Sequence, residues 1–63
     1  MEIGNAVKIC RSAKKLSLEE LAVKVNLSQS YLSMIESGKR MPTLPTIEKI
    51  AKALSVPTPI LLF

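Results

Sequence analysis

The chain has 63 residues, 48% of them hydrophobic, and nine Lys and Arg against five Asp and Glu give a net charge of +4. One cysteine and no histidine exclude an internal disulfide and, in practice, a structural zinc site. Stability must therefore come from apolar packing, within one copy or across a dimer interface. No stretch approaches the roughly 18 apolar residues of a membrane span, and the start of the chain lacks the features of a signal peptide. We expect a single cytoplasmic domain over residues 1–63, and the basic balance favours an anionic partner.

The first predicted helix covers residues 3–15. Its apolar stripe follows the i, i+3, i+4, i+7 spacing of a helix face that packs on a core, and comprises Ile3, Ala6, Val7, Cys10 and Ala13. Because Cys10 lies on this stripe and no general base accompanies it, we interpret it as a small core hydrophobe rather than a nucleophile.

A second helix is predicted over residues 18–25, with sequence signals at both ends. Ser17 followed by Glu20 forms a capping-box pattern, in which each side chain satisfies a backbone N–H of the other residue. The apolar face consists of Leu18, Leu21, Ala22 and Val25. Asn26 follows, and it is among the few non-glycine residues that tolerate the left-handed conformation with which helices often end.

The third predicted helix covers residues 29–37 and follows after only a short turn. Ser28 is a favourable N-cap, and Gly38 ends the helix. A turn of about three residues forces the two short helices to cross steeply, which is the helix-turn-helix arrangement. Leu32 and Ile35 point to one side of this helix, and its other side carries Gln29, Ser30, Ser33, Met34 and Ser37. This strip has no lysine, arginine or glutamate, and its short neutral donors and acceptors suit either base edges in a DNA major groove or plain solvation.

Two further helices complete the prediction. Thr43 caps a helix with Pro45 in its first turn, and its apolar face comprises Ile47, Ile50, Ala51 and Leu54. Thr58 and Pro59 are expected to be the cap and first position of a short last helix over residues 60–63. No segment alternates for long with the period of a strand, so the fold class is all-α.

Residues 16–54, LSLEELAVKVNLSQSYLSMIESGKRMPTLPTIEKIAKAL, resemble the Cro/C1-type (XRE-type) helix-turn-helix family of phage and bacterial repressors. The shared pattern comprises Leu16-Ser17, Glu20-Leu21-Ala22, Ser28, Ile35-Glu36, Gly38-Lys39, Pro42, Ile50-Ala51 and Leu54, with Gly4, Val7 and Arg11 before it and Leu61-Leu62 after it. The resemblance implies a compact five-helix, lambda-repressor-like DNA-binding domain, with the helix-turn-helix at helices two and three.

The resemblance also implies roles for individual residues. The base-contacting positions are Gln29, Ser30 and Met34, with Ser33 as a weaker candidate. The positions that face DNA phosphates are Ser28, Tyr31, Ser37, Lys39 and Arg40. Arg11 and Glu36 match a partly buried ion pair that ties the first helix to the recognition helix. Leu18 departs from the family, which often has Gln or another polar residue there at the phosphate backbone, and we expect this change to weaken or reorient the grip on DNA.

The chain end carries one apolar helical turn, which consists of Ile60, Leu61, Leu62 and Phe63. This turn either folds back on the first helix or forms the centre of a two-fold dimer interface. The family commonly pairs through this region, so the dimer is favoured. A dimer predicts a palindromic operator with half-sites roughly 34 Å apart. The alternative is that the chain is the DNA-binding part of a longer protein.

Together these features predict a sequence-specific transcriptional regulator, expected to be a repressor, that binds double-stranded DNA as a homodimer. The alternative is a protein-interaction module of the same fold, antitoxin-like or partner-binding, with weak or no DNA binding. Leu18 and the apolar chain end favour that alternative, whereas the polar strip and Gly38-Lys39-Arg40 favour DNA. No catalytic constellation is present, so no enzyme is expected. The sequence also gives no indication of a metal, a cofactor or a small-molecule ligand.

Overall fold

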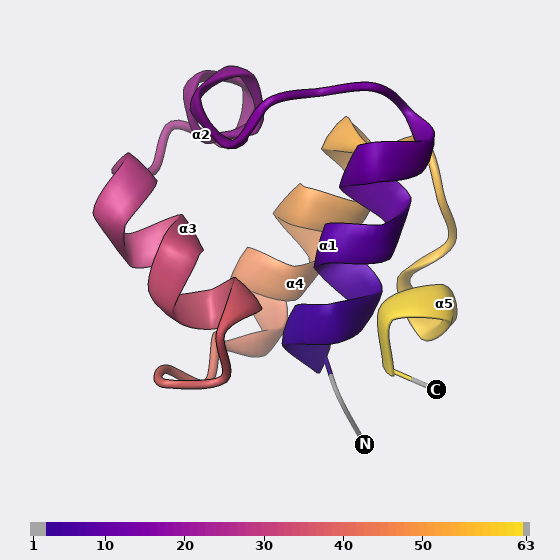
Figure 1. Ribbon diagram of the computed structural model, residues 1–63. Helices are drawn as coiled ribbons and strands as arrows, with labels where there is room; N and C mark the ends of the chain where they lie inside the picture. The colour runs from indigo at the N-terminus through magenta and orange to yellow at the C-terminus, as the bar shows by residue number, and fades with distance from the viewer. Residues whose placement is uncertain (1–2, 63) are drawn as a thin grey trace.

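The computed structural model describes residues 3–62, and all regular structure in that range is helical (Figure 1). The five helices are α1 (Ile3–Ala13), α2 (Leu18–Val25), α3 (Gln29–Glu36), α4 (Leu44–Ala53) and α5 (Thr58–Leu62). The prediction of an all-α, five-helix fold is confirmed. No helix within residues 3–62 is both long and apolar enough to cross a membrane.

The expected beginning of the last helix is wrong. The sequence pattern predicts a helix over residues 60–63 with Thr58 as its cap, but α5 already includes Thr58 and Pro59. The Ile60 N–H donates to the Pro57 carbonyl at 3.0 Å, so the helical turn begins before Thr58. Pro59 is tolerated because the first amides of a helix have no partner within it. Phe63 lies outside the described residues.

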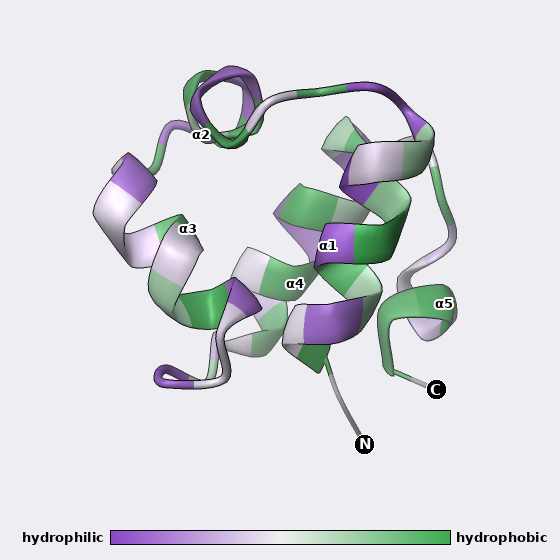
Figure 2. Ribbon diagram, in the orientation of Figure 1, coloured by the Kyte–Doolittle hydropathy of each residue, from purple (hydrophilic) through white to green (hydrophobic). Residues whose placement is uncertain are grey.

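The core is formed by side chains from all five helices. Its fully or nearly buried members are Val7, Leu21, Ala22, Val25, Leu32, Ile35, Ile47, Ile50, Ala51, Leu54 and Leu61. In Figure 2, α5 is largely green and α1 alternates between green and purple or white, whereas the beginning of α3 and the loop after it are mostly white to purple. The apolar faces predicted for the first four helices pack together, except that Ala13, predicted on the stripe of the first helix, is exposed at the end of α1.

Three helices end in the same way, with a left-handed residue followed by an apolar one. The left-handed residues are Lys15 after α1, Asn26 after α2 and Ser55 after α4, with φ of 58°, 57° and 58°. In each case the next N–H donates to the carbonyl five residues back, at 3.1, 3.0 and 3.0 Å, as in a Schellman motif. These next residues, Leu16, Leu27 and Val56, pack against the core. The C-terminal end of each of these three helices is therefore fixed by a hydrogen bond and a hydrophobic contact.

Candidate nucleic-acid interface

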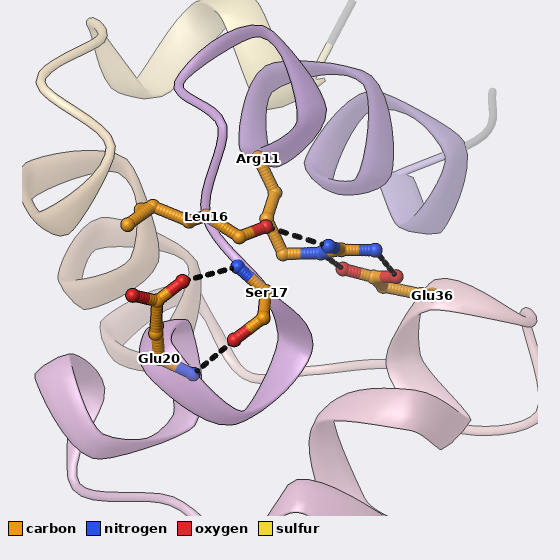
Figure 3. A network of polar contacts seen from close by, with 5 residues as sticks. All are labelled: Arg11, Leu16, Ser17, Glu20 and Glu36. Carbon is orange, nitrogen blue, oxygen red and sulfur yellow. Dashed lines mark hydrogen bonds and ion pairs between the residues drawn. The ribbon is translucent and has the colours of Figure 1, made fainter.

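The corner between α2 and α3 is held by local hydrogen bonds at both helix starts. Ser17 Oγ accepts from the Glu20 N–H at 3.0 Å, and Glu20 Oε1 accepts from the Ser17 N–H at 2.7 Å (Figure 3). The predicted capping box is therefore present, and the Ser17 N–H bond holds the pKa of Glu20 below its usual 4.5. Ser28 Oγ accepts from the Tyr31 N–H at 3.0 Å and caps α3. In Figure 1, α2 is seen nearly end-on while α3 runs across the view, so the two helices cross steeply.

The structure brings three of the four predicted base-contacting residues together on the outer side of α3. Gln29, Ser30 and Ser33 are exposed, and with Leu18 of α2 they line an open hollow at the corner. Met34 is half-buried, although its position on the helix predicted no burial. Leu32 and Ile35 are buried beneath this strip. The outer side of α3 is thus polar, and its inner side is packed in the hydrophobic core.

Four of the five residues predicted to contact phosphates lie at the ends of α3 or in the loop after it. Ser28, Ser37, Lys39 and Arg40 are exposed, whereas Tyr31 is half-buried with its ring against the core. The Arg40 guanidinium carbon lies 5.7 Å from the centroid of the Tyr31 ring, within the range of a cation–π contact. The Ser37 hydroxyl donates to the Met34 carbonyl at 3.2 Å. Ser37 is therefore already engaged at the end of its own helix, while Lys39 and Arg40 leave their charges at the surface.

The loop that carries these two cations is folded back onto α3. Gly38 has a φ of 83°, which side-chain-bearing residues rarely adopt. The amides of Lys39 and Arg40 both donate to the Met34 carbonyl, at 2.9 and 3.2 Å. These backbone hydrogen bonds thus hold the two basic residues close to the end of α3.

Arg11 forms the ion pair with Glu36 and makes one further bond. Its Nε and Nη2 donate to the two Glu36 carboxylate oxygens at 2.7 and 3.1 Å, and its Nη1 donates to the Leu16 carbonyl at 2.8 Å (Figure 3). The bond to Glu36 raises the pKa of Arg11 above its usual value. One guanidinium therefore connects α1, the entrance to α2 and the end of α3. The sequence predicted the first connection but not the bond to Leu16.

Gly4 has a structural role that sequence reasoning did not identify. A Cβ built there would lie 2.8 Å from the Glu36 carbonyl oxygen and closer still to that of Ile35. Real Cβ atoms do not approach backbone atoms so closely. The backbone of α1 therefore packs directly on the end of α3. The available signal was a glycine within a predicted helix, three residues before Val7 of its apolar stripe, where glycine is otherwise unfavourable.

The structure corrects one residue of the proposed dimer surface. Leu61 has no exposed area, because α5 packs against α1 and α4 and buries this side chain in the core. The alternative in which the last turn folds back on the first helix therefore holds for Leu61. Ile60 is 52% exposed, and Leu62 is half-buried.

Two crossed helices with a polar outer strip and an adjacent basic loop define a helix-turn-helix domain. The helix-turn-helix family matches residues 7–61, and the chain belongs to this family, in its Cro/C1-type branch. Relatives in this branch are transcriptional regulators.

Three similar proteins illustrate the relationship. The immunity repressor protein of Bacillus phage phi105 is 43% identical over 56 residues, which cover 89% of this chain and 39% of the repressor. Control protein C.BamHI of Bacillus amyloliquefaciens is 44% identical over 54 residues, covering 84% of this chain and 67% of that protein. The crystal structure of the biofilm regulator SinR in complex with DNA matches with a TM-score of 0.92 and 39% identity, covering 97% of this chain and 98% of that one.

Proposed function

We propose that this chain is a sequence-specific DNA-binding transcriptional regulator that inserts α3 into the major groove of an operator. The observation that carries the proposal is the exposed, uncharged strip of Gln29, Ser30 and Ser33 beside the cations of Lys39 and Arg40. The similarity to a phage immunity repressor and to a regulator solved with DNA supports it. Its effect would be repression by occupancy, since a bound protein blocks access to a promoter.

The exposed residues of α3 would contact bases, and the basic residues of the following loop would contact phosphates. Gln29 can donate to and accept from the edge of adenine, and the serine hydroxyls accept or donate as the base requires. Met34, half-buried at the margin of the strip, offers a thioether for an apolar base contact. Lys39 and Arg40 would pair with phosphates, which carry no sequence information but fix the register of the helix. Affinity should therefore fall steeply as salt rises.

The chain would bind as a homodimer on an inverted repeat. Ile60, which leaves 52% of its area exposed at the end of the fold, supports a contact between copies there, with Leu62 beside it. A two-fold dimer would place the recognition helices about 34 Å apart, which is one turn of DNA.

Selection of binding sites from a random duplex library at moderate salt tests these proposals. We expect enrichment of an inverted repeat. Enrichment of a single half-site would refute the dimer and leave DNA recognition intact. No enrichment, together with no band shift on random duplex at low salt, would refute DNA binding and favour a partner-binding module of the same fold.

A further inference from the structure

The hollow at the corner of the helix-turn-helix is lined by one apolar residue and three polar ones. Leu18, the first residue of α2, lies there beside Gln29, Ser30 and Ser33 of α3. The Leu18 side chain is half-buried, since part of it packs against the core and the rest borders the hollow. No charged side chain lines this space. An apolar patch is thus embedded in the surface that we propose to face base edges.

Hydrogen bonds at the start of α2 anchor the backbone that precedes Leu18. The residue before it, Ser17, is engaged in both bonds of the capping box, at 2.7 and 3.0 Å. The Leu16 carbonyl accepts from Arg11 at 2.8 Å. Because the backbone on this side is anchored before DNA arrives, little backbone freedom at Leu18 remains to be lost on binding.

Only one base presents a hydrocarbon group in the major groove. Thymine carries a methyl group at C5, whereas the other base edges there offer hydrogen-bond donors and acceptors. Leucine carbon atoms satisfy neither donors nor acceptors, but they gain from the burial of a methyl group. The chemistry of the hollow therefore matches thymine, with the polar residues around Leu18 available to neighbouring base atoms.

We infer that Leu18 is a specificity-determining residue, and that with Gln29, Ser30 and Ser33 it receives the 5-methyl group of one operator thymine. The inference rests on the proposed function, because it requires α3 to lie in the major groove. It gives Leu18 a positive role, in contrast to the weakened phosphate grip expected from the sequence.

Replacement of thymine by deoxyuridine isolates the methyl group, since the two bases pair identically with adenine. In the selected site, each thymine is replaced singly by deoxyuridine and the Kd is measured for the natural chain and for Leu18→Ala. We expect one thymine per half-site whose replacement weakens binding about fourfold in a Leu18-dependent way, because burial of one methyl group contributes about 0.8 kcal/mol. The same replacement should have no effect on Leu18→Ala.

Two further variants separate the methyl contact from other effects. Leu18→Met keeps a hydrocarbon surface and should retain the sensitivity to deoxyuridine, provided that thermal melting shows both Leu18 variants folded. Met34→Ala removes the other candidate for an apolar base contact; whatever it does to overall affinity, the loss on deoxyuridine replacement at the Leu18-dependent thymine should stay the same.

The outcomes distinguish this inference from the proposed function. Tight binding of the selected site with no Leu18-dependent thymine would overturn the methyl contact and leave DNA recognition standing. The Leu18 methyl contact would likewise be overturned if the loss of affinity on deoxyuridine replacement disappeared in Met34→Ala and persisted in Leu18→Ala. Failure of the natural chain to bind any duplex would overturn the proposed function, and the methyl contact with it.

Discussion

Gly4 lies where α1 crosses the end of α3, and no room for a methyl group exists there. The carbonyls of Ile35 and Glu36 occupy the space that a Cβ would need. These atoms belong to the backbone of a short helix, so they cannot move aside without tilting it. The close approach of the two helices therefore depends on this residue.

Gly4→Ala should lower the free energy of unfolding by about 3 kcal/mol, because it overpacks a rigid contact. Urea denaturation of the two proteins measures the difference. Asn5→Ala is the matched control, since Asn5 is exposed on the same helix and alanine is a better helix former there. Equal midpoints for Gly4→Ala and the natural chain would mean that α1 lies farther from α3 than the structure shows.

Gln29 and Lys39 are both exposed, but they should contribute to binding in different ways. Gln29→Ala should cost about 1–3 kcal/mol on the selected operator and little on random duplex, because it removes a base contact. Lys39→Ala should weaken both duplexes similarly and flatten the salt dependence, because it removes a phosphate contact. Titration of each variant with both duplexes checks this. Equal losses on operator and random DNA for Gln29→Ala would refute its assigned role.

At the scale of the elements, the ends of α1 and α4 store unfavourable backbone conformations. Lys15 and Ser55 are left-handed, and a Cβ makes that conformation costly. Asn26 adopts the same conformation after α2 at less cost, because its short polar side chain tolerates it. The three helix ends therefore share one backbone geometry, but the left-handed residue is more strained at Lys15 and Ser55 than at Asn26.

Lys15→Gly and Ser55→Gly should each stabilise the fold by about 0.5 kcal/mol, the relief of strain being partly offset by the greater freedom of glycine in the unfolded chain. Asn26→Gly should change little. Thermal melting of the three variants tests the order. Destabilisation by Lys15→Gly would show that its side chain contributes more than its conformation costs.

The capping box of α2 should make stability depend on pH in the acid range. The pKa of Glu20 is lowered on folding, so its contribution is present above the usual value of 4.5 and is lost as pH falls through the lower folded pKa. The melting temperature of the natural chain should therefore fall over this range more than that of Glu20→Gln, which keeps an acceptor without a titratable charge. Parallel acid profiles for the two proteins would contradict this.

At the scale of the whole molecule, the sequence predicted what depends on local chemistry. The capping box, the left-handed Asn26 and the apolar faces of the helices follow from short-range patterns. The burial of Leu61 and the contact at Gly4 depend on how distant segments meet, and no periodicity encodes that. The left-handed Lys15 and Ser55 escaped prediction for a similar reason, since tertiary anchoring of the following apolar residue overrides a poor local preference.

Arg11 is the clearest case of a residue whose effect extends over the whole fold, because its three bonds connect α1, the segment that leads into α2, and the end of α3. Lysine would keep the charge but lose the planar fork, so it could not donate to both Glu36 oxygens and the Leu16 carbonyl at once.

Arg11→Lys should therefore cost about 2 kcal/mol of stability through the lost hydrogen bonds. It should also weaken operator binding at temperatures where the protein is folded, since the α2–α3 corner loses its tie to α1. Lys14→Arg, an exposed exchange between the same two residue types, should change neither property. If Arg11→Lys has the same melting temperature and operator affinity as the natural chain, the charge alone, without the planar guanidinium, positions the recognition helix.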